Sequence, residues 1–100
     1  MNIVQVKNGK VELYRDSGVR IRTIVSNGAI NAAINTDQTL VVVTTDKGKV
    51  ELYRESGVRI RTIVSCGAVN AVFSGKDILV TTNNGKSELH KESGPLIRRF

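Results

Sequence analysis

Residues 9–26 read GKVELYRDSGVRIRTIVS, and residues 48–65 read GKVELYRESGVRIRTIVS. The two segments agree at 17 of 18 positions and differ at Asp16 against Glu55. A third copy, GKSELHKESGPLIRRF, occupies residues 85–100. The copies begin 39 and 37 residues apart, so the chain is a tandem repeat of about 38 residues. A fixed period of this length is typical of arrays in which each repeat is one supersecondary unit.

Each repeat divides into four segments of strand length. In the central repeat they are 29–34, 40–45, 49–54 and 58–64, and short segments rich in Asn, Asp, Ser and Gly join them. Asn-Gly at positions 8–9 and 84–85 predicts type I′ hairpin turns, because both residues tolerate positive φ. No segment has a helical period and no connection is long enough for a crossover helix. The sequence therefore predicts an antiparallel meander of about eleven strands.

The four segments differ in the burial that their residues predict. Residues 40–43 are all apolar, as in a strand covered on both faces. Residues 50–53 alternate between apolar and polar, which predicts a strand with one buried face. In segment 58–64, strict alternation would place Ile60 and Ile63 on opposite faces. Buried strands followed by half-exposed ones are typical of a four-stranded β-propeller blade followed from its inner edge outward.

The last repeat resembles a WD-repeat blade over almost its whole length. The matching segments are 68–73 and 78–82 for the first two strands, 74–77 for the turn between them, 85–89 for the third strand and 94–100 for the outer strand. The resemblance implies the architecture alone, because the Trp-Asp pair is replaced by Leu13-Tyr14, Leu52-Tyr53 and Leu89-His90. The chain is also similar to short propeller-repeat proteins of phages.

The repeat count bears on assembly. We treat residues 1–100 as one β-repeat domain with units 1–28, 29–67 and 68–100. The first unit lacks the segment for its innermost strand, so the chain supplies two complete blades and one partial blade. Because propellers close with about four to eight blades, we expect a homodimer that forms a six-bladed ring. The alternative fold is a β-trefoil, which also has three four-stranded units and closes as a monomer.

Repeated arginines are the most prominent candidate site. The net charge is +6 and the pI is near 9.9, which favours acidic partners. The candidate contacts to such a partner are Arg20, Arg22, Arg59, Arg61, Arg98 and Arg99. The competing interpretation is a solvated outer strand on which Glu12, Glu51 and Glu88 pair with arginines. Such exposed pairs contribute on the order of 0–1 kcal/mol each.

Other residues offer no chemistry that the sequence can identify. We expect His90 to be a surface residue of an outer strand and Cys66, the one cysteine, to have no special role. No cluster of Cys and His predicts a metal site, and no glycine-rich turn into a helix predicts a phosphate site. We therefore expect no catalytic residue, no cofactor and no metal.

The function predicted from these features is a non-catalytic, self-assembling propeller that serves as a structural or protein-interaction scaffold, including a role as a phage structural protein. The expected partners are a second copy and other proteins. The alternatives are a nucleic-acid-binding module that uses the arginines and a lectin-like glycan binder. Because no signal peptide or membrane-spanning segment is evident, we expect a location in the cytoplasm or within a virion and no membrane partner.

Overall fold

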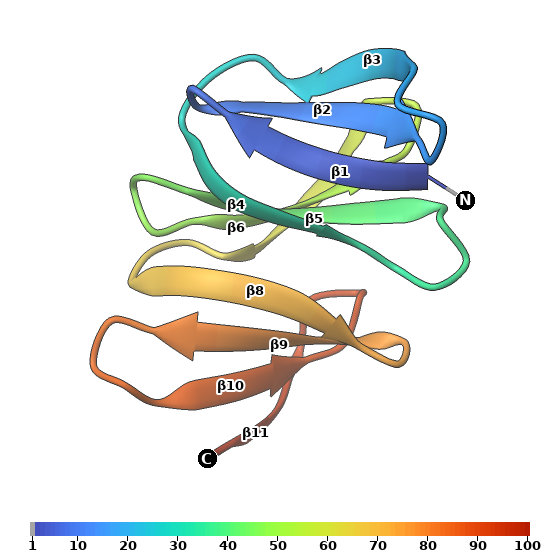
Figure 1. Ribbon diagram of the computed structural model, residues 1–100. Helices are drawn as coiled ribbons and strands as arrows, with labels where there is room; N and C mark the ends of the chain where they lie inside the picture. Colours follow the sequence, from blue (N-terminus) through green and yellow to red (C-terminus); the bar gives the residue numbers. More distant parts are fainter. Residues whose placement is uncertain (1) are drawn as a thin grey trace.

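The computed structural model describes residues 2–100, and these residues form eleven β-strands (Figure 1). The strands are β1 (Asn2–Lys7), β2 (Lys10–Arg15), β3 (Arg20–Val25), β4 (Ala29–Ile34), β5 (Leu40–Thr45), β6 (Val50–Arg54), β7 (Arg59–Val64), β8 (Ala68–Ser74), β9 (Asp77–Thr82), β10 (Ser87–His90) and β11 (Leu96–Arg99). The strand-length segments of the sequence correspond closely to these elements.

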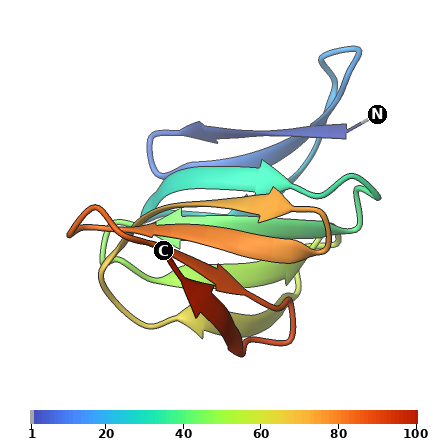
Figure 2. The same cartoon turned by 90° about the horizontal axis from the view of Figure 1, so that it is seen from below.

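The strands form three separate antiparallel sheets, each a simple meander. The first has the order β1-β2-β3, the second β4-β5-β6-β7 and the third β8-β9-β10-β11. Figure 1 shows the sheets following one another in chain order, and Figures 1 and 2 place the two termini on opposite end sheets. This arrangement confirms propeller blades and excludes the β-trefoil, because each repeat forms its own sheet.

The core consists of two apolar clusters, one on each side of the second sheet. Val41 and Val43 face the first sheet, whereas Val42 faces the third. All three side chains are fully buried, which confirms that the residue run 40–43 is covered on both faces. Dispersion and burial in the two clusters are the main contacts between the three sheets, because no strand of one sheet pairs with a strand of another.

The outer strands depart from the alternation that the sequence predicts. Ile60 and Ile63 of β7 both pack into the cluster between the second and third sheets. The pairing of β7 with β6 shifts register twice, and the two isoleucines are the residues left without a partner. A bulge adds one residue and reverses the side-chain alternation beyond it. The expectation of opposite faces was therefore wrong, because two bulges turn both isoleucines toward the core.

The two Asn-Gly pairs adopt different turns. Asn8 and Gly9 have φ of 53° and 78°, which confirms the predicted type I′ geometry. At the other pair only Gly85 has a positive φ, 83°, and the Thr82 amide donates to the Lys86 carbonyl at 2.8 Å. That pattern is a three-residue loop that ends in a left-handed glycine. The second type I′ prediction was wrong because Asn83 lengthens the loop by one residue.

Candidate functional site

We use the word joint for the contact between two consecutive sheets. Next to the apolar cluster of each joint, a backbone hydrogen bond links the sheets: Ala29 donates to the Gly9 carbonyl, and Ala68 donates to the Gly48 carbonyl, both at 3.0 Å. In the second joint the Asn31 side chain of β4 also donates to the Asn70 side chain of β8. The same contacts recur because the same residues recur.

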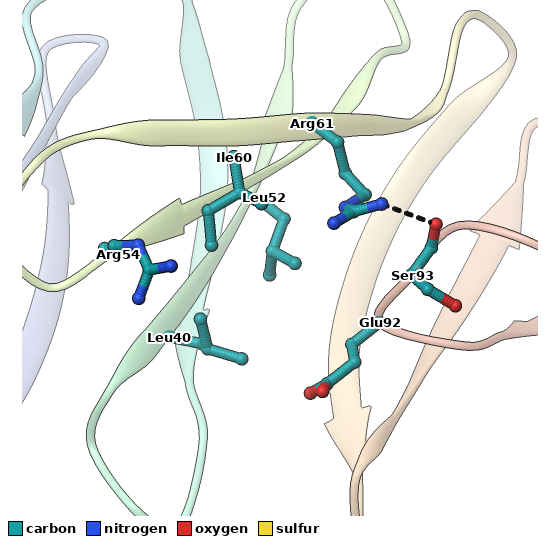
Figure 3. Close-up of a pocket in the computed structure, with 7 residues that line it drawn as sticks. All are labelled: Leu40, Leu52, Arg54, Ile60, Arg61, Glu92 and Ser93. Carbon is teal, nitrogen blue, oxygen red and sulfur yellow. Dashed lines mark hydrogen bonds between the residues drawn. The ribbon is translucent and has the colours of Figure 1, made fainter.

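An arginine spans the outer part of each joint. Arg22 Nη1 donates to the Ser56 carbonyl at 3.3 Å, and Arg61 Nη1 donates to the Ser93 carbonyl at 2.8 Å. In both cases the arginine belongs to an outer strand and the acceptor to the turn after the third strand of the next sheet. Figure 3 shows the Arg61 bond as a dashed line. We call this bond the arginine bridge.

Beside the second arginine bridge lies a cleft of about 250 Å³. Its apolar wall is formed by Leu40, Leu52 and Ile60, while Arg54 and Glu92 place charges at its margins (Figure 3). The cleft is thus an open groove between two blades, and both a positive and a negative side chain stand beside its apolar wall. This combination of apolar and oppositely charged groups indicates no single class of ligand.

A polar triad recurs on the last two strands of every sheet. In the first sheet Tyr14 donates to Glu12 at 3.3 Å and Arg20 donates to the same carboxylate at 3.0 Å. The second sheet repeats the pattern with Tyr53, Arg59 and Glu51, at 3.2 and 3.1 Å. The third sheet forms its triad from His90, Arg99 and Glu88, at 3.2 and 3.0 Å. These ion pairs confirm the expected pairing of the strand glutamates with arginines.

The pKa is shifted at three triad residues, Glu12, Glu88 and Tyr53. The hydrogen bond from Arg20 lowers the pKa of Glu12 below its ordinary value, against the opposing effect of burial. The hydrogen bonds from His90 and Arg99 lower the pKa of Glu88 in the same way. Burial of the phenol, aided by the Glu51 charge, raises the pKa of Tyr53. Glu12 and Glu88 are therefore held as carboxylate hydrogen-bond acceptors.

His90 corrects one expectation from the sequence. It is buried, and its ring nitrogens lie 3.1 Å from the Gly94 carbonyl oxygen and 3.2 Å from Glu88 Oε1. The prediction of a surface residue was wrong, because the ring lies against the turn after β10 and is held there by Gly94 and Glu88. The imidazole takes the structural place of the tyrosines in the other two sheets.

The six arginines thus occupy different environments, although sequence grouped them as one surface. Arg20, Arg59 and Arg99 are held by carboxylates of their own sheets. Arg22 and Arg61 form the bridges, and the guanidinium of Arg98 has no partner among residues 2–100. Their contact with an acidic partner stays a prediction. The bulge at Ile60 explains why Arg59 and Arg61, two residues apart, bond on opposite sides of their sheet.

Sequence reasoning missed the arginine bridges. A usable signal was present, since an arginine and a serine separated by 34 residues in one joint and 32 in the other recur with the repeat. The acceptor is a backbone carbonyl, however, so no particular side chain marks it. Among residues 2–100, no group of three or more His, Cys, Asp or Glu side chains is placed to hold a metal ion. None of the described segments is a helix long and apolar enough to cross a membrane.

Known structures share this architecture at low sequence identity. BamB from Moraxella catarrhalis superposes with a TM-score of 0.76 and 16% identity, over 98% of this chain and 32% of BamB. A chain of the mitotic checkpoint complex superposes with a TM-score of 0.82 and 15% identity, over 99% of this chain and 34% of its own length. The chain therefore spans about a third of the propeller chains that it matches.

These likenesses and the three-sheet geometry define the class: the chain is a β-propeller repeat protein. Within that class it belongs to the family described as the Helicobacter pylori IceA2 protein, whose model matches residues 1–63. No curated protein matches the chain.

Proposed function

We propose that the protein is a non-catalytic interaction scaffold that associates with a second copy of itself to complete a propeller. Three sheets per chain give six in a dimer, within the range of about four to eight blades in which propellers close. Repeat arrays bury their cores between neighbouring units, so a terminal unit needs either a polar cap or a partner. The third sheet ends in apolar residues instead of a polar cap.

One comparison carries this proposal. Leu13 and Leu52 occupy the same position in the first and second sheets and are 1% and 2% exposed. Leu89 occupies that position in the third sheet and is only half-buried, because no sheet within residues 2–100 covers it. Phe100 is 65% exposed, whereas the corresponding Ile24 and Ile63 are 7% and 8% exposed. The third sheet thus exposes the apolar residues that the other sheets bury.

The mass of the protein in solution tests the proposal. We expect native mass spectrometry and light scattering at micromolar concentration to give a species of twice the chain mass of 10.9 kDa. A monomer that stays stable at that concentration would contradict self-assembly.

The scaffold is preferred over nucleic-acid binding because five of the six arginines already bond to groups of the protein. Neutralisation of several phosphates makes affinity fall steeply with salt. Affinity for DNA that does not change with salt concentration would exclude that alternative. Roles in glycan binding and in a phage particle stay predictions from the sequence.

A further inference from the structure

The two ends of the chain expose complementary halves of the joint that it already contains twice. At the C-terminal end, the outward face of the third sheet carries Leu79, Leu89, Ile97 and Phe100, all half-buried or exposed. Their counterparts in the second sheet, with Val42 and Leu52 at the centre, are buried against the next sheet. This face has the composition of a joint without its second half.

Arg98 is the unfilled arginine bridge of that face. It lies opposite Leu89 in the β10–β11 pairing, as Arg61 lies opposite Leu52 and Arg22 lies opposite Leu13. Arg22 and Arg61 each reach a serine carbonyl in the next sheet, whereas the Arg98 guanidinium has no partner among residues 2–100. The donor is therefore present and its acceptor is not supplied by the described part of the chain.

The matching acceptor is at the opposite end. Ser17 occupies in the first sheet the turn position of Ser56 and Ser93, and its carbonyl receives no hydrogen bond from residues 2–100. The adjacent glycines show the same contrast. A Cβ at Gly94 would lie 3.9 Å from Arg61 Cδ of the preceding sheet, whereas a Cβ at Gly18 would meet nothing within 4 Å.

We infer that two copies associate head to tail, with the third sheet of one copy against the first sheet of the other and Arg98 donating to the carbonyl of Ser17. The inference rests on the proposed self-assembly and names the surfaces that carry it. A second copy is the occupant because one chain exposes both the donor and the acceptor of a bridge that it forms internally twice. When both ends of two copies associate in this way, the two chains form a closed ring. Head-to-tail association that did not close would give filaments.

The joint between copies differs from the internal joints in two respects. Gln5 of the first sheet, opposite Glu12, is exposed and stands where the second sheet has the buried Val43, opposite Glu51. Ala29 and Ala68, which donate to Gly9 and Gly48, begin the innermost strands of the second and third sheets. The first sheet has no such strand within residues 2–100, so the Gly85 carbonyl gains no equivalent donor. The outer half of the joint, with the apolar residues and the Arg98 bridge, would hold the copies together. We therefore expect the joint between copies to be weaker than the internal joints.

Cross-linking of single-cysteine variants tests the orientation. Cys66 is exposed and is first replaced by the asparagine of the preceding repeat, Cys66→Asn. In that background Arg98→Cys and Ser17→Cys are prepared separately, mixed in equal amounts and treated with a short bismaleimide. Head-to-tail association predicts a covalent species of twice the chain mass in the mixture and none in either variant alone. The double variant Arg61→Cys/Ser93→Cys is the matched control and should cross-link within one chain.

Each other outcome has a distinct meaning. A cross-linked dimer of Arg98→Cys alone would show that two third sheets face each other, which overturns the orientation and leaves self-assembly intact. Dimers in light scattering without a cross-link in the mixture would also overturn only the orientation. A monomeric wild-type protein would overturn the proposed function itself. Arg98→Cys could itself dissociate the dimer, and Arg99→Cys is the control for that result, because the native Arg99 side chain is held by Glu88. The Arg99→Cys protein must stay dimeric. Dissociation of both variants would overturn the assignment of Arg98.

Discussion

At the scale of single residues, the triads show that one geometry tolerates two chemistries. Tyr14 and Tyr53 use a phenol hydroxyl to reach the glutamate two residues before them, and His90 uses Nε2 at a similar distance. The glutamate is the same residue in all three triads, because it must accept hydrogen bonds from both the Tyr or His side chain and a guanidinium. Such charge-assisted bonds are stronger than neutral ones, although the exposed arginines limit their contribution.

Replacing Glu88 should therefore change how stability depends on pH. The native pKa of Glu88 is lowered from 4.5, so the unfolded state binds the proton first as pH falls. The stabilisation is complete above pH 4.5 and is lost as the pH falls through the lower native pKa. We expect Glu88→Gln to lower the urea midpoint near neutral pH by up to about 0.5 M, and this deficit should shrink in acid.

Urea unfolding between pH 3 and 7 measures this effect. Glu92→Gln is a suitable control, because the Glu92 carboxylate forms no bond within residues 2–100. A constant deficit at every pH for Glu88→Gln would show that the carboxylate has no special electrostatic role.

Thr44 gives a second prediction at this scale. Its side chain is buried and Oγ1 has no hydrogen-bond partner among the described residues. In the first sheet the same register position holds Val6, opposite Val11 as Thr44 is opposite Val50. Because an unsatisfied buried hydroxyl costs free energy, Thr44→Val should raise the free energy of unfolding by about 1 kcal/mol. Thr81→Val, at the half-buried counterpart, should change it by less, and equal effects would contradict the explanation.

At the scale of elements, the sequence predicted the strands better than their side-chain directions. Alternation in the segment 49–54 was enough to place Val50 and Leu52 on the buried face, because that strand is regular. The adjacent outer strand contains two bulges, and no residue type at positions 60 and 63 marks them in advance. Bulges depend on how a strand fits its neighbour, so they reflect packing more than local sequence.

The turns between second and third strands offer a test of the joints. Gly48 and Gly85 have nearly equal φ, 80° and 83°, so alanine at either position carries a similar backbone strain of about 1–2 kcal/mol. A Cβ at Gly48 would also lie 2.6 Å from the nitrogen of Gly67, which directly precedes β8 of the next sheet, whereas one at Gly85 would meet nothing within 4 Å. We expect Gly48→Ala to cost a further 1–3 kcal/mol or so beyond Gly85→Ala.

Thermal and urea unfolding of the two glycine variants, each against wild type, supply that difference. Equal costs would mean that the close approach of the two sheets at Gly48 is absent in solution.

At the scale of the whole molecule, the repeat predicted the propeller architecture because a 38-residue period admits few closed arrangements. Arg98 was foreseen as a candidate contact, but it was grouped with five arginines that bond within the chain. The copies that begin at Gly48 and Gly85 align Arg98 with Arg61 and Arg99 with Thr62. Strand pairing gives the same correspondence, and Arg99 binds Glu88. The repeat therefore separates the two arginines, but only the structure shows that the position of Arg61 forms a bridge between sheets.

The two leucines at matching positions distinguish folding from assembly. Leu52 is buried within the chain, so Leu52→Ala should lower the free energy of unfolding by about 2–5 kcal/mol at any protein concentration. Leu89 is half-buried in the single chain, and a second copy would cover it. Leu89→Ala should therefore change the free energy of unfolding little in dilute protein. It should weaken dimerisation and remove the dependence of the melting temperature on protein concentration, since association stabilises the folded state by mass action. Calorimetry across a hundredfold range of concentration measures both effects, and a Leu89→Ala protein whose melting temperature rises with concentration as steeply as that of wild type would place the interface elsewhere.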